Sequence, residues 1–298
     1  EYFDYKSDPT KKDTDGDGYD DNVDPRPLIS DVTYYSIKDP NYVSIYAPND
    51  PNIDGDYGYG GRQNWFSEEN WFSQDYEINN YGCGLIAASD LFLYFALQDS
   101  TYKNSLTDVA IKNNNIDKAD YMDYVRKVNR LFIPLSRITG ITGSNLAGGM
   151  NGYFKYAEMD YWASWVDSLS DADMLSKIEE MLENDIPVIL CVGPNTPNMI
   201  FGKKGINLYT QRKEGEKDYN DNGDLYQYYI NYNRTNEVYQ HYMVITQVIK
   251  DDVASKHSVM LKVSSWGRSN YIDYDEYRGY IKVVGGTWTS SIIDIKSL

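Results

Sequence analysis

The apolar pattern of the chain changes from helical to strand-like near residue 186, and this change limits the folds that it can adopt. Helical spacing comes first, at residues 83–98, 116–132 and 171–185. Short apolar runs typical of strands follow, at residues 187–192, 241–251, 257–265 and 280–286. Helices followed by strands predict an α+β protein with a helical half and a sheet half.

Charge and hydropathy exclude several classes of function. The net charge of −17 at pH 7 repels nucleic acid and anionic lipid, so we expect no nucleic-acid partner. No run of about 18 apolar residues occurs, so we expect no membrane insertion. The chain opens with "EYFDYKSDPT" rather than a signal peptide, which suggests a piece of a longer protein with flanking domains.

An acidic stretch at residues 13–24, "DTDGDGYDDNVD", has the spacing of a calcium loop. Carboxylates occupy its first, third, fifth, ninth and twelfth positions, namely Asp13, Asp15, Asp17, Asp21 and Asp24. Gly18 allows a sharp turn, and Tyr19 offers its backbone carbonyl as a further ligand. Calcium prefers six to eight oxygen ligands, which this spacing can wrap around one ion. A solvated acidic linker is the alternative.

The acidic stretch resembles a thrombospondin type 3 repeat, "DxDxDGxxDxxD", more than an EF-hand, whose last ligand is usually Glu. The resemblance implies a structural calcium ion that stiffens a connection between domains. Pro25 and Pro27 indicate a boundary. We therefore predict a calcium-binding repeat and linker at residues 1–30 and a second domain at residues 31–298.

The chain has two cysteines, too few for a disulfide framework, and one of them has the setting of a nucleophile. Cys83 opens a helical run between Gly82 and Gly84, where a helix N-terminus and a nearby imidazolium lower a thiol pKa. Cys191 lies in an apolar strand and is expected to be a small core residue. A disulfide between the two remains open.

A base for Cys83 must come from one of the two histidines. His257 lies near a hairpin turn and is expected to be exposed. His241 begins a strand, where a side chain is held rigidly, and the next strand ends in "SSWG" at residues 264–267. We therefore predict that His241 is the base and that the pKa of Cys83 lies below the free value of about 8.5.

The order of a Cys that opens a helix, a His that begins a strand and an SWG turn resembles papain-like cysteine peptidases. The closest likeness is to the bacterial branch related to bacteriocin leader peptidases, over residues 60–285. The resemblance implies a helical half with the Cys helix, packed on an antiparallel β half with the His strand. It implies a cleft between them, with Cys83 as nucleophile and His241 as base.

Two family positions carry different residues in this chain. Ser264 stands where the family has the Asn or Asp that orients the histidine. Glu77 stands where the family has the glutamine that binds the oxyanion, so Gln74 becomes the candidate donor, with Asn79 and Asn80 as alternatives.

The resemblance implies a secreted or surface-attached bacterial cysteine peptidase that acts on a peptide or protein. One alternative is an amidase or acyltransferase that acts on cell-wall peptide. Another is a catalytically degenerate adhesion or binding module, which the residues at positions 77 and 264 favour.

Overall fold

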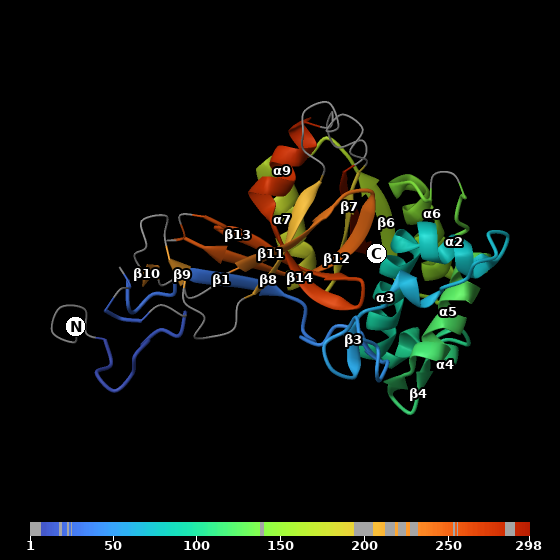
Figure 1. The fold of residues 1–298 in the computed structure, drawn as a ribbon, viewed down its shortest axis with the longest axis horizontal. Helices are drawn as coiled ribbons and strands as arrows, with labels where there is room; N and C mark the ends of the chain where they lie inside the picture. Colours follow the sequence, from blue (N-terminus) through green and yellow to red (C-terminus); the bar gives the residue numbers. More distant parts are fainter. Residues whose placement is uncertain are drawn as a thin grey trace.

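The computed structural model describes residues 7–17, 20–22, 24, 26–137, 140–193, 205–211, 218–219, 225–226, 232–252, 254, 256–283 and 290–298. These residues form a mixed α+β structure with an antiparallel main sheet, which confirms the predicted fold class at this level. Figure 1 shows helices α2 to α6 gathered on one side of the molecule and the main sheet on the other.

The helical half is arranged around one buried helix. α3 (Cys83–Gln98) is buried at every position from Gly84 to Ala96, which explains its nearly continuous apolar sequence. Three helices contact it, namely α2 (Gln74–Tyr81), α5 (Lys118–Leu131) and α6 (Gly143–Tyr156). The short elements of this half are η1 (Gln63–Trp65), η2 (Ser100–Tyr102), α4 (Thr107–Ala110), β4 (Ile111–Lys112) and β5 (Asn115–Ile116).

The main sheet places β12 (His241–Asp251) at its centre. The strand order is β11-β8-β14-β13-β12-β7-β15-β6. Their bounds are β6 (Tyr161–Val166), β7 (Val188–Val192), β8 (Ile206–Gln211), β11 (Tyr232–Val238), β13 (Val259–Ser265), β14 (Arg268–Asp273) and β15 (Ser291–Ser297). β7 pairs with the first half of β12, and β1 (Val32–Ser36) pairs with its second half.

Helices α7 (Asp171–Glu183) and α3 both pack against the sheet at β12. α7 contacts β1, β7, β12 and β15, and α3 contacts β12 from the helical half. Two small hairpins complete the structure, β2 (Ser44–Tyr46) with β3 (Tyr57–Tyr59) and β9 (Asp218–Tyr219) with β10 (Leu225–Tyr226). The contact between α3 and β12 brings the two halves together at one end of the central strand (Figure 1).

The strand expected at residues 280–286 is wrong. Its first four residues belong to a helix, α9 (Tyr274–Val283), and residues 284–289 lie outside the described part. Tyr274, Tyr277 and Ile281 are buried at helical spacing, and Asp275 and Glu276 stabilise the first turn. A short apolar run alone does not distinguish a strand from the end of such a helix.

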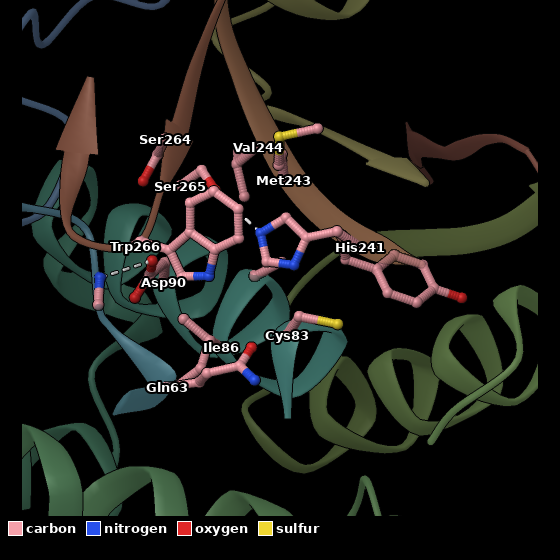
Figure 2. Close-up of a pocket in the computed structure, with 13 residues that line it drawn as sticks. Gln63, Cys83, Ile86, Asp90, His241, Met243, Val244, Ser264, Ser265 and Trp266 are labelled. Carbon is pink, nitrogen blue, oxygen red and sulfur yellow. Dashed lines mark hydrogen bonds between the residues drawn. The ribbon is translucent and has the colours of Figure 1, made fainter. Parts of the chain in front are cut away.

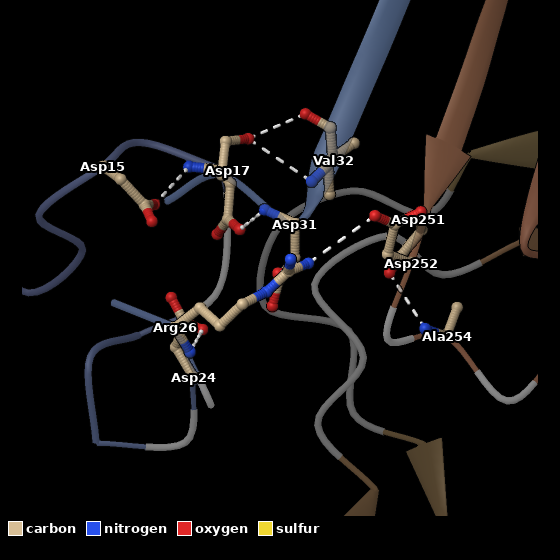
Figure 3. Close-up of polar contacts among 10 residues, drawn as sticks. Asp15, Asp17, Asp24, Arg26, Asp31, Val32, Asp251, Asp252 and Ala254 are labelled. Atoms are coloured by element: carbon tan, nitrogen blue, oxygen red, sulfur yellow. Dashed lines mark hydrogen bonds and ion pairs between the residues drawn. The ribbon is translucent and has the colours of Figure 1, made fainter. Parts of the chain in front are cut away.

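The acidic segment lies at the far end of β12 from the helical half (Figure 1). The Asp31 N–H donates to Asp17 Oδ2 at 2.6 Å, and Arg26 forms ion pairs with Asp31 and Asp252. Figure 3 shows these contacts beside the last residue of β12, Asp251. The predicted domain boundary at residue 30 stays a prediction.

The helices also bear on the expectation about membranes. Among the described residues, no single helix is long and apolar enough to cross a membrane. The bent pair α2 and α3, at 92° to each other, has the length and composition of a membrane span when the two helices are taken together, and nothing beyond length and composition supports one.

Candidate active site

Cys83 is the first residue of α3, and the glycines on both sides are required by close packing. A Cβ at Gly82 would lie 2.3 Å from the Ile78 carbonyl oxygen. A Cβ at Gly84 would lie 2.8 Å from the Ile141 side chain and 3.1 Å from that of Tyr242. Gly84 therefore lets the first turn of α3 approach β12 closely, and Gly82 allows the tight turn from α2 into α3.

His241 is the first residue of β12, and two neighbours on one turn hold its ring. Its Nε2 is 2.9 Å from Ser265 Oγ, and the indole of Trp266 stacks on it with a centroid separation of 4.4 Å and an interplanar angle of 22°. Trp266 and Gly267 both have positive φ, which forms the tight turn between β13 and β14. This arrangement leaves Nδ1 available to the pocket.

Cys83 and His241 line one pocket between α3 and the sheet. Figure 2 shows the thiol side chain coming from the helix and the imidazole from the strand on the opposite side. The cavity is about 20 Å³, room for one water-sized group such as a carbonyl oxygen. The structure thus brings together the predicted nucleophile and base, although 158 residues separate them in sequence.

Burial shifts both groups toward their neutral forms. It raises the pKa of the Cys83 thiol, and the backbone N–H groups of Tyr242, Gly84 and Cys83 only partly oppose the increase. Burial lowers the pKa of His241 to about 4. The expected lowering of the Cys83 pKa is therefore wrong for the free protein, because desolvation outweighs the helix N-terminus. The pair rests as thiol and neutral imidazole.

Ser265, rather than Ser264, contacts the histidine. Successive side chains on a strand point to opposite faces, so only one of the two serines on β13 can face His241. Ser264 Oγ instead donates to the Tyr59 carbonyl at 2.7 Å and ties the β3 hairpin to the sheet. The prediction that Ser264 orients His241 is therefore wrong, and Ser265 takes this position.

Gln74 does not face the pocket. Its Nε2 donates to the Arg126 carbonyl at 2.8 Å and to Asn129 Oδ1 at 2.7 Å, which joins α2 to α5. Glu77 forms an ion pair with Arg137. Gln74 as the oxyanion donor is therefore wrong, because the first turn of α2 is oriented toward α5.

Gln63, on η1, supplies the glutamine that the pocket contains. Figure 2 shows its amide beside Cys83. One Nε2 hydrogen goes to the Asn79 carbonyl at 2.6 Å, and Oε1 is buried with no hydrogen-bond partner among the described residues. Sequence spacing missed Gln63 because it lies 20 residues before the cysteine. The preceding Gly60-Gly61 pair is the signal that could have found it.

Asp90 fixes the backbone that leads to Gln63. This carboxyl is buried on α3; its Oδ1 accepts from the Tyr121 hydroxyl at 2.6 Å and its Oδ2 from the Gly61 N–H at 2.9 Å. Burial raises the pKa of Asp90 to about 7. A Cβ at Gly61 would lie 1.9 Å from the Tyr121 hydroxyl, so the loop requires glycine there. A single acid inside an apolar helix was the signal in the sequence.

The remaining cysteine and histidine lie outside the pocket. Cys191 is buried in β7, where burial raises its pKa to about 12, and both cysteines are thiols. The structure therefore has no disulfide between Cys83 and Cys191, a pairing that the sequence left open. His257 is partly buried, against expectation, because its Nδ1 is hydrogen-bonded to Asp273 Oδ2 at 2.6 Å.

The acidic segment gathers some of the predicted calcium ligands. Carboxylate oxygens of Asp13, Asp15 and Asp17 all lie within 4.8 Å of one another. Asp21 instead accepts two hydrogen bonds from Thr14, each of 2.7 Å. The predicted ligand Tyr19 lies outside the described residues.

Two carboxyls of this segment are in an unfavourable environment without a cation. Within the described part of the chain, Asp15 Oδ2 and Asp24 Oδ2 are buried and have no hydrogen-bond partner. Burial and the neighbouring carboxylates Asp17 and Asp15 raise the pKa of Asp24 to about 6, and burial also raises that of Asp15. A hard divalent cation fits this set of oxygens.

Comparison with known proteins supplies no relative from which to transfer a role. No protein-family model matches the chain, and no curated protein matches it.

Proposed function

We propose that the protein is a cysteine peptidase with a papain-like arrangement, in which Cys83 is the nucleophile and His241 the base. The observation that carries the proposal is the shared pocket, where a helix N-terminus presents a thiol to a histidine held by Ser265 and Trp266. Nucleophilic catalysis by a thiol requires such a base in the same site. The substrate is a peptide or protein.

The first step transfers the thiol proton as the carbon–sulfur bond forms. The His241 tautomer with hydrogen on Nε2 donates to Ser265 Oγ and leaves Nδ1 to accept the Cys83 proton. Sulfur attacks the carbonyl carbon, and the carbonyl oxygen becomes an oxyanion. The Cys83 N–H and the second Nε2 hydrogen of Gln63 then stabilise this charge.

The second step breaks the peptide bond. The oxyanion collapses to a thioester, the carbon–nitrogen bond breaks, and Nδ1 of His241 returns the proton to the leaving amine. Water then attacks the thioester, with His241 taking its proton and giving it to the Cys83 sulfur. Because the pKa of His241 is about 4, the base stays neutral across ordinary pH, and turnover is lost only as pH falls through about 4.

A peptidyl acyloxymethyl ketone tests this chemistry, because it places a carbonyl at the thiol. We expect peptide mapping to find label on Cys83 at pH 7, with Cys83→Ala unlabelled and Cys191→Ser labelled like the native protein. His241→Gln should slow labelling by about 100-fold or more. Absence of label on native Cys83 would refute the peptidase.

Alkylation by a small reagent tests separately whether Cys83 and His241 rest in their neutral forms. We expect iodoacetamide at pH 6 to modify Cys83 no faster than a free thiol, because the thiolate is disfavoured. Rapid alkylation at pH 6 that depends on His241 would instead indicate a thiolate–imidazolium pair.

A non-catalytic binding module is the second candidate, favoured by the neutral resting pair and by the uncharged hydroxyl of Ser265. Failure of probe labelling, together with peptide binding in the same pocket, would support it. An amidase or acyltransferase would label as the peptidase does, and would differ in releasing products only from cell-wall peptide or only with an acceptor amine.

We also propose that residues 13–24 bind a structural calcium ion. Asp13, Asp15, Asp17 and Asp24 would hold it, and its charge would neutralise the buried oxygens Asp15 Oδ2 and Asp24 Oδ2, which have no hydrogen-bond partner among the described residues. Such a site suits a secreted or surface-attached protein. Calorimetric titration of metal-free protein with calcium tests the proposal, and no heat of binding at millimolar calcium would refute it.

A further inference from the structure

A groove of about 450 Å³ adjoins the catalytic pocket and has a different chemical character. The two share Ser265 and Trp266, so the groove begins at the residues that hold His241. Its walls are the loop and helix at residues 52–64, strand β8 and the β13–β14 turn. Gln63 separates two groove residues, Arg62 and Asn64, so this wall is continuous with the pocket.

Two guanidinium groups line the groove in a protein of net charge −17. Burial lowers the pKa of Arg62, and the positive charge of Arg268 lowers it further against the opposing effect of Asp50, so the two cations lie close enough to repel. Asp54, which is exposed, is the one carboxylate among the described residues that line the groove. The groove therefore has a local excess of positive charge.

The guanidinium groups of the two arginines differ in their contacts with the protein. Arg62 Nη1 donates to the Asn52 carbonyl at 3.1 Å, which holds its guanidinium in the wall. Arg268 is exposed and has no ion pair within the described part of the chain. Amide and hydroxyl side chains, including those of Asn64 and Asn270, surround them. This combination of a fixed and an available guanidinium is suited to a carboxylate, which accepts several charge-assisted hydrogen bonds.

The position of the groove indicates which part of a substrate it would contact. The proposed mechanism requires His241 to protonate the leaving amine, so the leaving segment must pass His241. Trp266 stacks on that imidazole and also lines the groove. A peptide that leaves the pocket past Trp266 therefore enters the groove with the residues C-terminal to the cleaved bond.

We propose that this groove selects substrates with a carboxylate shortly after the cleaved bond, either an Asp or Glu side chain or a free C-terminus. Arg268 is the main specificity-determining residue and Arg62 supports it. That the carboxylate lies after the cleaved bond rests on the proposed peptidase function. Recognition of a carboxylate by the groove does not.

Binding to the Cys83→Ala variant tests recognition without turnover. Three peptides with a carboxylate on the side chain, no carboxylate, or a carboxylate at the C-terminus are compared by NMR titration: acetyl-Ala-Ala-Glu amide, acetyl-Ala-Ala-Gln amide and acetyl-Ala-Ala-Ala with a free carboxyl group. We expect at least one carboxylate peptide to bind about tenfold more tightly than the Gln peptide. Whichever of the two shows the preference identifies the source of the carboxylate. High salt should reduce the preference.

Variants assign the preference to the groove. Arg268→Gln in the same background should remove most of it, and Arg268→Glu should disfavour the carboxylate peptides. Arg130→Gln, the same change at an exposed arginine of α5, should leave it unchanged. Equal affinity for all three peptides, or a preference that survives both Arg268 variants, would overturn the proposal.

Cleavage of a digested proteome by the native protein tests the side of the substrate. We expect Asp, Glu or the peptide C-terminus to be enriched within the first three positions after the cut, and Arg268→Gln to lose the enrichment. Cleavage without enrichment would overturn the selectivity and leave the peptidase standing. Absence of cleavage would overturn the peptidase, while the binding comparison would still decide whether the groove recognises carboxylates.

Discussion

The catalytic pocket and the acidic segment at residues 13–24 both crowd polar groups together, but they stabilise them differently. In the pocket, His241 is bonded to Ser265, and Asp90 accepts from two donors of the protein. In the acidic segment, Asp15 and Asp24 each keep a buried oxygen without a partner among the described residues. The comparison indicates that the protein itself satisfies the buried carboxyl of the pocket, whereas the carboxyls of the acidic segment need a cation.

A single strand connects the two regions. β12 carries His241 as its first residue and Asp251 as its last, and the acidic segment is attached beside Asp251 through Asp31 and Arg26. Eleven residues in extended conformation place the two ends of β12 roughly 33 Å apart. A rigid central strand should let each site change without altering the other.

The largest effect should come from removing the nucleophile or the base. We expect Cys83→Ala and His241→Gln to lower kcat/KM by about 10³-fold or more, because each removes a group that forms or breaks bonds. Calorimetry should find their calcium affinity unchanged. A joint loss of activity and calcium affinity would show that the two regions are coupled through β12.

Gln63 and Gln74 provide a matched pair for the oxyanion donor. We expect Gln63→Ala to lower kcat by about 10²-fold, because the developing negative charge loses a donor. Gln74→Ala should mainly lower stability, since its amide bridges α2 and α5. Steady-state kinetics and thermal melts of both variants test this, and the assignment is wrong if Gln74→Ala has the larger effect on kcat.

The parts of the site that sequence could predict are those set by local pattern. Cys83 at the start of an apolar helix and His241 at the start of a strand follow from periodicity and flanking glycines. The choice between Ser264 and Ser265 depends on which face of β13 meets His241. A shift of one residue reverses that face, so the linear order cannot settle it.

Gln63 shows a second limit of sequence. Its place beside Cys83 depends on a loop held by Asp90 and Tyr121, which are 27 and 58 residues further along the chain. Such long-range hydrogen bonds leave no periodic pattern. The misassigned strand at residues 280–286 has another cause, because an apolar run of this length fits a helix end equally well.

The acidic segment should respond to pH in opposite directions with and without calcium. Without metal, the pKa of Asp24 in the folded chain is about 6, above its unfolded value, so its contribution to stability is present below about pH 4 and lost as pH rises through 6. With calcium, the ligands must be ionised, so affinity should fall as pH drops through 6.

Hydrogen exchange of residues 7–31 measures this response. We expect metal-free protein to be better protected at pH 5 than at pH 7.5, and calcium-loaded protein to show the reverse. Asp15→Asn and Asp24→Asn should weaken calcium binding by about tenfold, whereas Asp108→Asn, an exposed acid on α4, should not. Identical protection with and without calcium would contradict the comparison.

The smallest effect should come from the group that orients His241. Ser265 is uncharged, and a neutral hydrogen bond contributes only about 0.5–1.5 kcal/mol, so Ser265→Ala should lower kcat by roughly two- to tenfold. The reduction should appear in kcat rather than KM, because the hydroxyl stabilises the imidazolium that forms during the reaction. Ser264→Ala is the control, since it leaves the partly buried Tyr59 carbonyl without this donor and should lower the melting temperature while changing kcat less. A Ser264→Ala variant with the larger loss of kcat would show that the β3 hairpin, and not the Ser265 hydroxyl, sets the orientation of the histidine.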